Sequence, residues 1–185
     1  HIQEIQKLSG ETEAEIHKIM IMGGSRIAIR ISSYAPDNMA IKLIECDKQK
    51  SYKLAEYMND IIIIQGDGRN VDLLKEEGIR DMDAFIALTD SSETNILACL
   101  TAKELGVKKT IAEVENIQFI STAERLNIGN IINKKLLAAS RIFQLLLDED
   151  SSNAKCLALS DAEVVELVAK ENSKITKAAV KDLKL

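Results

Sequence analysis

The sequence predicts an α/β protein built on a doubly wound parallel sheet. Short runs of apolar residues recur along the chain and are continuously apolar, which is typical of strands buried on both faces. Helical patterns separate these runs at the spacing of right-handed crossover connections. The first run ends in a glycine turn, Gly23–Gly24, which is expected to open a helix.

The first two expected strands flank this glycine turn. Residues 18–22 form the first strand and residues 40–45 the second, with a helix between them. The only proline of the chain, Pro36, falls in the loop before the second strand, where it interrupts no hydrogen-bond ladder. Four further apolar runs complete the expected sheet: residues 61–64, 84–89, 109–114 and 129–132.

Two helices can be predicted in more detail. Residues 48–59 should form a helix with Asp47 as its N-cap. Residues 91–106 should form a longer helix that ends at Gly106, and Asp90 and Glu93 have the spacing of a capping box at its start. The side chains expected to face inward are Leu54, Ala55 and Met58 in the first helix and Ile96, Leu97, Leu100 and Leu105 in the second.

The segment 134–147 differs from these helices because it has almost no polar face. A helix that is apolar nearly all round must be covered on both sides, and a partner subunit or a second subdomain would do this. Strand-like runs follow at residues 156–159 and 164–168. We therefore expect a small α+β subdomain after the helix, cut short at the end of the chain.

Composition excludes several functions. The chain has 185 residues, 46% of them apolar, and a net charge of −5, which disfavours nucleic acid as a partner. Its three cysteines are far apart in sequence and form no C-x-x-C motif, and their odd number argues against a disulfide framework. A reducing cytoplasm is therefore expected. No apolar run approaches the roughly 20 residues that span a bilayer, so no membrane insertion is expected. No metal-binding cluster of Cys and His is present in the sequence.

The glycine turn and the end of the second strand have the layout of a dinucleotide-binding βαβ unit. Gly23 permits a tight turn, and Gly24, Ser25 and Arg26 lead into a helix whose free N–H groups would face a pyrophosphate. Ser25 stands where the second glycine of the fingerprint is usual. Glu45, at the end of the second strand, would accept hydrogen bonds from ribose hydroxyls and repel a 2′-phosphate.

The loops after the third and fourth strands should line the same crevice. Gly66-Asp67-Gly68 follows the third strand, and Asp67 would meet a ribose hydroxyl or the adenine edge. Thr89 and Asp90 follow the fourth strand, at the point where the strand order reverses. No positioned acid, base or nucleophile accompanies these residues, so no catalytic residue is predicted.

These motifs together resemble the RCK (KTN) domain of potassium-transport regulators, and among them the Trk potassium-uptake regulators. The stretches that carry the resemblance are 21–27, 43–45, 66–68, 84–90 and 93–98, and their order and spacing fit over residues 18–147. The resemblance implies a Rossmann-like fold and a regulatory subunit rather than an enzyme. It also implies NAD(H) or ATP/ADP as ligand, held by Gly23, Ser25, Arg26, Glu45, Asp67, Thr89 and Asp90.

The resemblance further implies a domain plan and partners. Residues 1–17 would be a linker from a preceding unit, 18–133 the nucleotide-binding domain of a second unit, 134–150 a crossover helix with a linker, and 151–185 the start of a C-terminal subdomain. Such units form dimers or rings on the cytoplasmic side of a membrane potassium pore and gate it. Glu113 stands where many members have an arginine near the phosphates, which favours NAD(H) over a triphosphate.

Two alternatives remain open from the residues. Ser25, Ala28 and Glu113 are also compatible with an RCK half that has lost its ligand and serves only in assembly. An NAD-dependent dehydrogenase fragment would require a catalytic domain beyond Leu185.

Overall fold

The computed structural model describes residues 15–146, 151–156 and 163–167, together with the single positions 169, 171, 173 and 176. The chain divides into two compact units, His1–Ile132 and Asn133–Leu185. Most of the expected N-terminal linker, residues 1–14, lies outside the described residues, as do residues 147–150 after the apolar helix.

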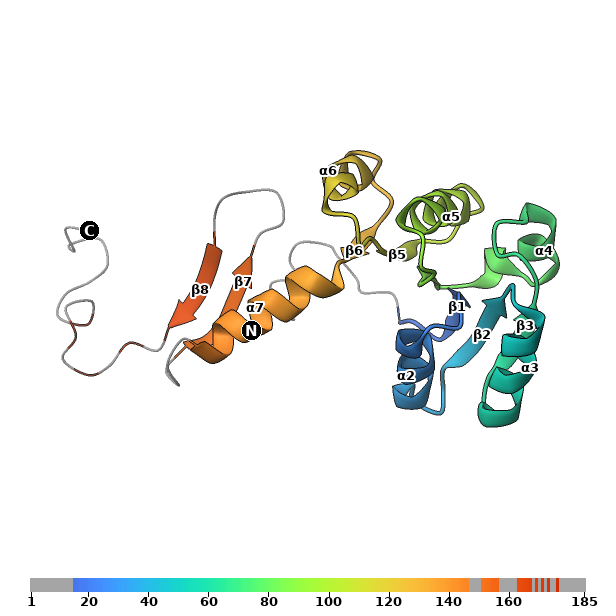
Figure 1. Ribbon diagram of the computed structural model, residues 1–185, viewed down its shortest axis with the longest axis horizontal. Coiled ribbons are helices and arrows are strands. Elements are labelled where there is room, and N and C mark those ends of the chain that lie inside the picture. The colour runs from blue at the N-terminus through green and yellow to red at the C-terminus, as the bar shows by residue number, and fades with distance from the viewer. Residues whose placement is uncertain are drawn as a thin grey trace. The chain divides into compact units, whose positions relative to one another are not determined.

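The first unit contains a six-stranded parallel sheet in the order β3-β2-β1-β4-β5-β6 (Figure 1). Its strands are β1 (Lys18–Met22), β2 (Ala40–Glu45), β3 (Ile62–Gln65), β4 (Ala84–Ala87), β5 (Lys109–Glu113) and β6 (Asn130–Ile132). This confirms the predicted doubly wound α/β fold. The strand order reverses between β1 and β4, so the loops that follow these two strands face each other at the carboxyl edge of the sheet.

Helices cover both faces of this sheet. Helices α2 (Arg26–Tyr34) and α3 (Lys48–Tyr57) lie on one side, and α4 (Val71–Glu76), α5 (Ser92–Glu104) and α6 (Ile117–Arg125) lie on the other, with the 3₁₀ turn η1 (Ile79–Asp81) after α4 (Figure 1). Each face has its own aliphatic core. Ile21 and Leu43 pack toward α2 and α3 on one face, and Met20 and Phe85 pack toward α4, α5 and α6 on the other.

Helix α5 corrects two sequence predictions. Its N-cap is Ser91, whose Oγ accepts from the Thr94 N–H at 3.1 Å, and not Asp90. Its buried face is a stripe of small residues that includes Ala98, Cys99 and Ala102, whereas Leu97, predicted to face inward, is 59% exposed. Small side chains let the helix lie close to the sheet. Ile96, Leu100 and Leu105, also predicted to face inward, pack against the core as partly buried side chains.

Helix α3 follows its prediction more closely. Asp47 is the N-cap, as predicted, and its carboxylate accepts from the Lys50 N–H at 2.7 Å. Leu54 is buried, while Ala55, which was expected to face inward, is exposed. The helix therefore contacts the sheet along a narrower face than the apolar residues suggest.

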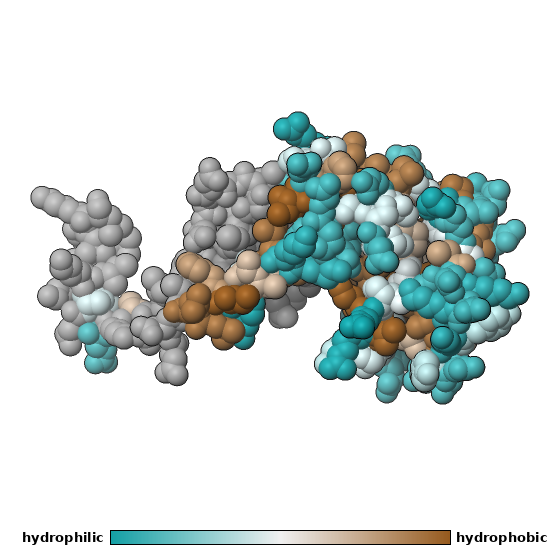
Figure 2. Space-filling model, in the orientation of Figure 1, coloured by the Kyte–Doolittle hydropathy of each residue, from teal (hydrophilic) through white to brown (hydrophobic). Residues whose placement is uncertain are grey.

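The second unit contains helix α7 (Lys134–Leu146) and the antiparallel strands β7 (Ser151–Cys156) and β8 (Glu163–Leu167). Strand β7 ends where the first predicted run was expected to begin, and residues 157–160 lie outside the described part of the chain. Helix α7 carries a hydrophobic surface (Figure 2), to which Leu145 contributes at 71% exposure. Within the described residues, every helix is too short or too polar to cross a membrane.

Candidate functional site

A cleft of about 330 Å³ opens at the carboxyl edge of the sheet, between the loops that follow β1, β2, β3 and β4. The predicted site residues that line it are Gly23, Gly24, Ser25, Glu45, Asp67, Thr89 and Asp90. Arg26, the first residue of α2, is exposed and is not part of the lining. Cys46, Lys50 and Arg69 also line the cleft and were not predicted.

The glycine turn holds the loop after β1 against the end of β4. Gly23 has a φ of +96°, which favours glycine, and a Cβ at this position would lie 2.9 Å from the Leu88 carbonyl oxygen. The Gly23 N–H donates to the Ile44 carbonyl at 2.8 Å, which ties the turn to β2. A larger residue at this position would force β1 and β4 apart at the mouth of the cleft.

Ser25 acts locally as the N-cap of α2. Its Oγ accepts from the Ala28 N–H at 3.2 Å, so the residue that replaces the second fingerprint glycine begins the helix. The first N–H groups of an α-helix have no acceptor within the helix. The start of α2 thus provides backbone donors and the positive end of a helix dipole beside the cleft.

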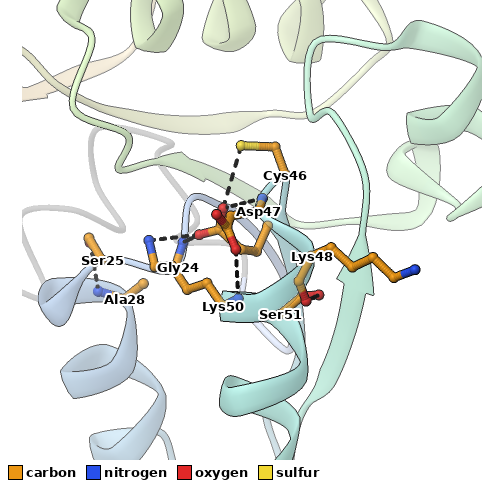
Figure 3. A network of polar contacts seen from close by, with 9 residues as sticks. Gly24, Ser25, Ala28, Cys46, Asp47, Lys48, Lys50 and Ser51 are labelled. Atoms are coloured by element: carbon orange, nitrogen blue, oxygen red, sulfur yellow. Dashed lines mark hydrogen bonds and ion pairs between the residues drawn. The ribbon is translucent and has the colours of Figure 1, made fainter.

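Glu45 is the most strongly held polar group of the cleft. Gly24, Cys46, Asp47 and Lys50 gather around its carboxylate (Figure 3). Oε2 accepts from the Gly24 N–H at 2.9 Å and pairs with Lys50 Nζ at 2.8 Å, and Oε1 accepts from the Asp47 N–H at 2.9 Å. Burial alone would raise the pKa of Glu45, but the hydrogen bonds from Lys50, Asp47 and Gly24 outweigh it and lower the pKa to about 2. Glu45 is therefore a permanent acceptor at neutral pH.

Asp67 is already engaged in an ion pair in the loop after β3. Its Oδ2 lies 2.7 Å from Arg69 Nη2, and its Oδ1 accepts from the Arg69 N–H at 2.9 Å. The hydrogen bond from the Arg69 side chain lowers the pKa of Asp67. Both side chains are largely exposed, so this pair is weak and a ligand can rearrange it at low cost.

The loop after β4 is fixed by Asn95, a fully buried residue of α5 that the sequence did not single out. Its Oδ1 accepts from the Thr89 N–H at 3.0 Å and from Thr89 Oγ1 at 2.6 Å. Its Nδ2 donates to the carbonyls of Thr89 at 2.9 Å and Glu113 at 2.8 Å. Asn95 thus joins the loop after β4 to the end of β5 and holds Thr89 at the cleft.

Glu113 was expected to lie near the phosphates of a ligand. It ends β5, is 3% exposed, and is not part of the lining of the cleft. Its side chain is therefore not a wall of the cleft, and the expected repulsion of a triphosphate by its charge stays a prediction.

The lining offers hydrogen-bond acceptors, backbone donors and two cationic side chains, which is a set that suits a polar, phosphate-bearing ligand. Among the described residues, no group of three His, Cys, Asp or Glu side chains is arranged to hold a metal ion. The described histidine, His17, immediately precedes β1, and its backbone N–H donates to Asp83 at 2.8 Å, before the start of β4. That contact lies at the amino edge of the sheet, opposite the cleft.

The strand order, the glycine turn and the acid at the end of β2 define a Rossmann-type domain. The sequence matches the TrkA-N domain family over residues 19–134. The chain belongs to this family.

Known relatives agree with this assignment. The chain is 31% identical over 188 residues to the Trk system potassium uptake protein TrkA of Vibrio alginolyticus, and the match covers all of the chain but 41% of that relative. The fold is similar to the GsuK channel bound to NAD, with a TM-score of 0.58 and 16% identity, over 78% of this chain and 25% of that one. It is also similar to GsuK bound to ADP, with a TM-score of 0.59 and 16% identity, over 76% of this chain and 36% of that one.

Proposed function

We propose that this chain is a regulatory, nucleotide-sensing unit of a potassium uptake system. The proposal rests on one observation: a buried, ionised Glu45, a glycine turn and a helix N-terminus lie around the same cleft. NAD(H) is the expected ligand, and ATP or ADP are the alternatives. The unit binds the ligand without turning it over, and the ligand alters the shape through which a membrane potassium pore is gated.

In this proposal each part of the ligand has its own partners. The N-terminus of α2, with the Ser25 hydroxyl and the nearby Arg26, faces the phosphates. Glu45 accepts from the ribose hydroxyls. Asp67, Thr89 and Asp90 border the nucleoside half of the cleft.

The similar proteins described above support this role by analogy. The relative from Vibrio alginolyticus is named as a potassium uptake protein, and the GsuK structures hold NAD or ADP. Residues 18–133 would form the nucleotide-binding domain, 134–150 the crossover helix with its linker, and 151–185 the start of a C-terminal subdomain. Residues 1–17 would connect to a preceding unit, and the assembly would lie on the cytoplasmic face of the cell membrane.

Self-association is the second part of the proposal. Helix α7 exposes Leu137 and Ile142 at 59% each and Leu145 at 71%, and an apolar helix surface of this kind is stable only when covered. Sedimentation velocity should show dimers or larger species that Leu145→Glu dissociates. Lys135→Gln, which lowers the net charge of the same helix by the same one unit at an exposed position, should leave them intact. A monomer at all concentrations would contradict this part.

Calorimetric titration tests the ligand. NAD⁺, NADH, ADP and ATP are titrated separately into the purified chain, and at least one should bind. Glu45→Gln should weaken binding at least tenfold, because hydrogen bonds to a charged acceptor contribute about 1.5–3 kcal/mol. The exposed Glu56→Gln on α3 serves as the control and should bind as the unaltered chain does. Absence of binding by all four nucleotides from a folded sample would refute the proposal.

A structural half without a ligand is the second candidate. It is favoured by the fact that both oxygens of Glu45 already have partners within the chain. In that case Glu45→Gln would leave the regulation of potassium uptake unchanged in a strain that depends on this protein. A loss of regulation by a variant that remains folded supports the nucleotide-sensing role instead.

A further inference from the structure

The acceptor capacity of Glu45 is filled. A carboxylate offers about four lone-pair positions, and four donors occupy them here. Oε2 receives the Gly24 N–H at 2.9 Å and Lys50 Nζ at 2.8 Å, while Oε1 receives the Asp47 N–H at 2.9 Å and the Cys46 thiol at 3.5 Å. The Glu45 side chain is 5% exposed, so little of it is left open to a ligand.

These four donors differ in how readily they can leave. The N–H groups of Gly24 and Asp47 belong to the backbone of the glycine turn and of the N-cap of α3, and are fixed by the fold. The thiol of Cys46 is a weak donor at a long distance. Lys50 is charged and 49% exposed, so its ammonium group can move into water at low cost. Lys50 is the one strong donor to Glu45 that a ligand can displace.

We propose that Lys50 competes with the ribose for Glu45, so that nucleotide binding requires this ion pair to open. The inference rests on the proposed function, because it assumes that Glu45 accepts from a ribose. A ribose diol brings two hydroxyl donors, and Glu45 can accept both only after Lys50 and Cys46 have withdrawn. The ion pair thus keeps the empty cleft closed to weakly bound sugars and sets the affinity of the site.

The ammonium of Lys50 is not needed to hold α3. The helix is capped by Asp47, which accepts from the Lys50 backbone N–H at 2.7 Å, and this bond does not involve the side chain. Replacing the side chain therefore leaves the cap in place. Lys48 lies in the same first turn of α3, and Figure 3 shows its side chain extending away from the cluster that Lys50 joins. Lys48 is not part of the lining of the cleft, which makes it the matched control.

Lys50 has two opposed effects on a nucleotide. It blocks Glu45 from the ribose, and its charge attracts the phosphates that lie elsewhere in the cleft. Adenosine separates the two effects, because it has the ribose diol and no charge. Replacing the Lys50 side chain should therefore increase the affinity for adenosine. For ADP at low salt, the increase in affinity should be smaller, or the affinity should fall. The gain for ADP should approach that for adenosine at high salt, where the attraction is screened.

The test compares the unaltered chain with Lys50→Met, Lys50→Gln and Lys48→Met. Adenosine, 2′-deoxyadenosine and ADP are titrated into each protein, and binding is measured from the amide NMR shifts. We expect both Lys50 variants to bind adenosine about two- to fivefold more tightly, because opening a half-exposed ion pair reduces the affinity by about this factor. We also expect a smaller gain for 2′-deoxyadenosine and no change in Lys48→Met.

The other outcomes distinguish failure of the Lys50 competition from failure of the proposed function. If the unaltered chain and the variants bind adenosine and ADP equally well, the competition is refuted and the proposed function stands. Weaker binding of adenosine by both Lys50 variants refutes it too, because Lys50 would then be a ligand contact. If neither the unaltered chain nor the variants bind any of the three compounds, the competition is refuted. If the unaltered chain also fails to bind NAD⁺, NADH and ATP, the proposed function fails as well.

Discussion

Replacing Glu45 by glutamine tests how the cleft is held together. The substitution keeps the shape of the side chain but removes its charge and turns one of its two acceptors into a donor. In either orientation of the amide, the new N–H₂ group faces existing donors: the Gly24 N–H and Lys50 on one side, or the Asp47 N–H on the other. A buried donor left against another donor costs about 1–3 kcal/mol. We therefore expect Glu45→Gln to lower the free energy of unfolding by this amount at pH 7.

The low pKa of Glu45 gives the same experiment a pH dependence. A pKa of about 2, against an ordinary value of 4.5, corresponds to at most about 3 kcal/mol of stability. Screening through the half-exposed Lys50 reduces this to about 1–2 kcal/mol. Because the folded pKa is depressed, this stability is present above pH 4.5 and is lost as the pH falls toward 2. By pH 3, roughly 1 kcal/mol of it should be gone.

Urea denaturation followed by circular dichroism measures both effects. The difference in unfolding free energy between the unaltered chain and Glu45→Gln should narrow by about 1 kcal/mol between pH 6 and pH 3. The exposed Glu56→Gln corrects for the loss of a carboxylate in general. A Glu45→Gln variant as stable as the unaltered chain at pH 7, with the same pH profile, would show that the charge and hydrogen bonds of Glu45 do not stabilise the fold.

Three further predictions concern the cleft and the residues that support it. Gly24→Ala should lower stability by about 1–3 kcal/mol in thermal unfolding, because the added Cβ would press on the Leu54 side chain and lie 2.9 Å from Glu45 Oε2; an unchanged melting temperature would contradict this. Asn95→Leu should lower the free energy of unfolding by about 2–4 kcal/mol, because the Thr89 N–H and the carbonyls of Thr89 and Glu113 lose their hydrogen-bond partner. A variant equally stable in urea would contradict this. Mass-spectrometric mapping of thiol labelling at pH 8 should find Cys46 modified and Cys99 protected, because burial raises the pKa of Cys99 to about 12. ADP should slow the labelling of Cys46, which lines the cleft, and labelling at the same rate with and without ADP would contradict this.

The sequence predicted the sheet well for a definite physical reason. Strands buried on both faces are mostly apolar, so the bounds of β1 and β2 follow from the largely apolar runs at 18–22 and 40–45. The inward face of α5 was predicted only in part, because Ile96, Leu100 and Leu105 pack against the core as expected, whereas Leu97 is exposed. A close approach between helix and sheet also selects small residues such as Ala98, which the prediction missed.

The site was predictable only in part. Gly23 and Glu45 follow from a local pattern, because a tight turn and a strand end are features of short segments. The roles of Lys50, Arg69 and Asn95 depend on contacts that the side chains make once the loops have folded. No periodicity or spacing encodes these contacts, so the structure was required to find them.

An amide NMR titration of the chain with ADP and with NAD⁺ tests directly whether the cleft holds a nucleotide. If it does, we expect shifts confined to the loops that line the cleft, at Gly23, Gly24, Cys46, Gly68 and Thr89, with little change at the amino edge of the sheet. Shifts concentrated at the amino edge, or none with either nucleotide at millimolar concentration, would contradict it.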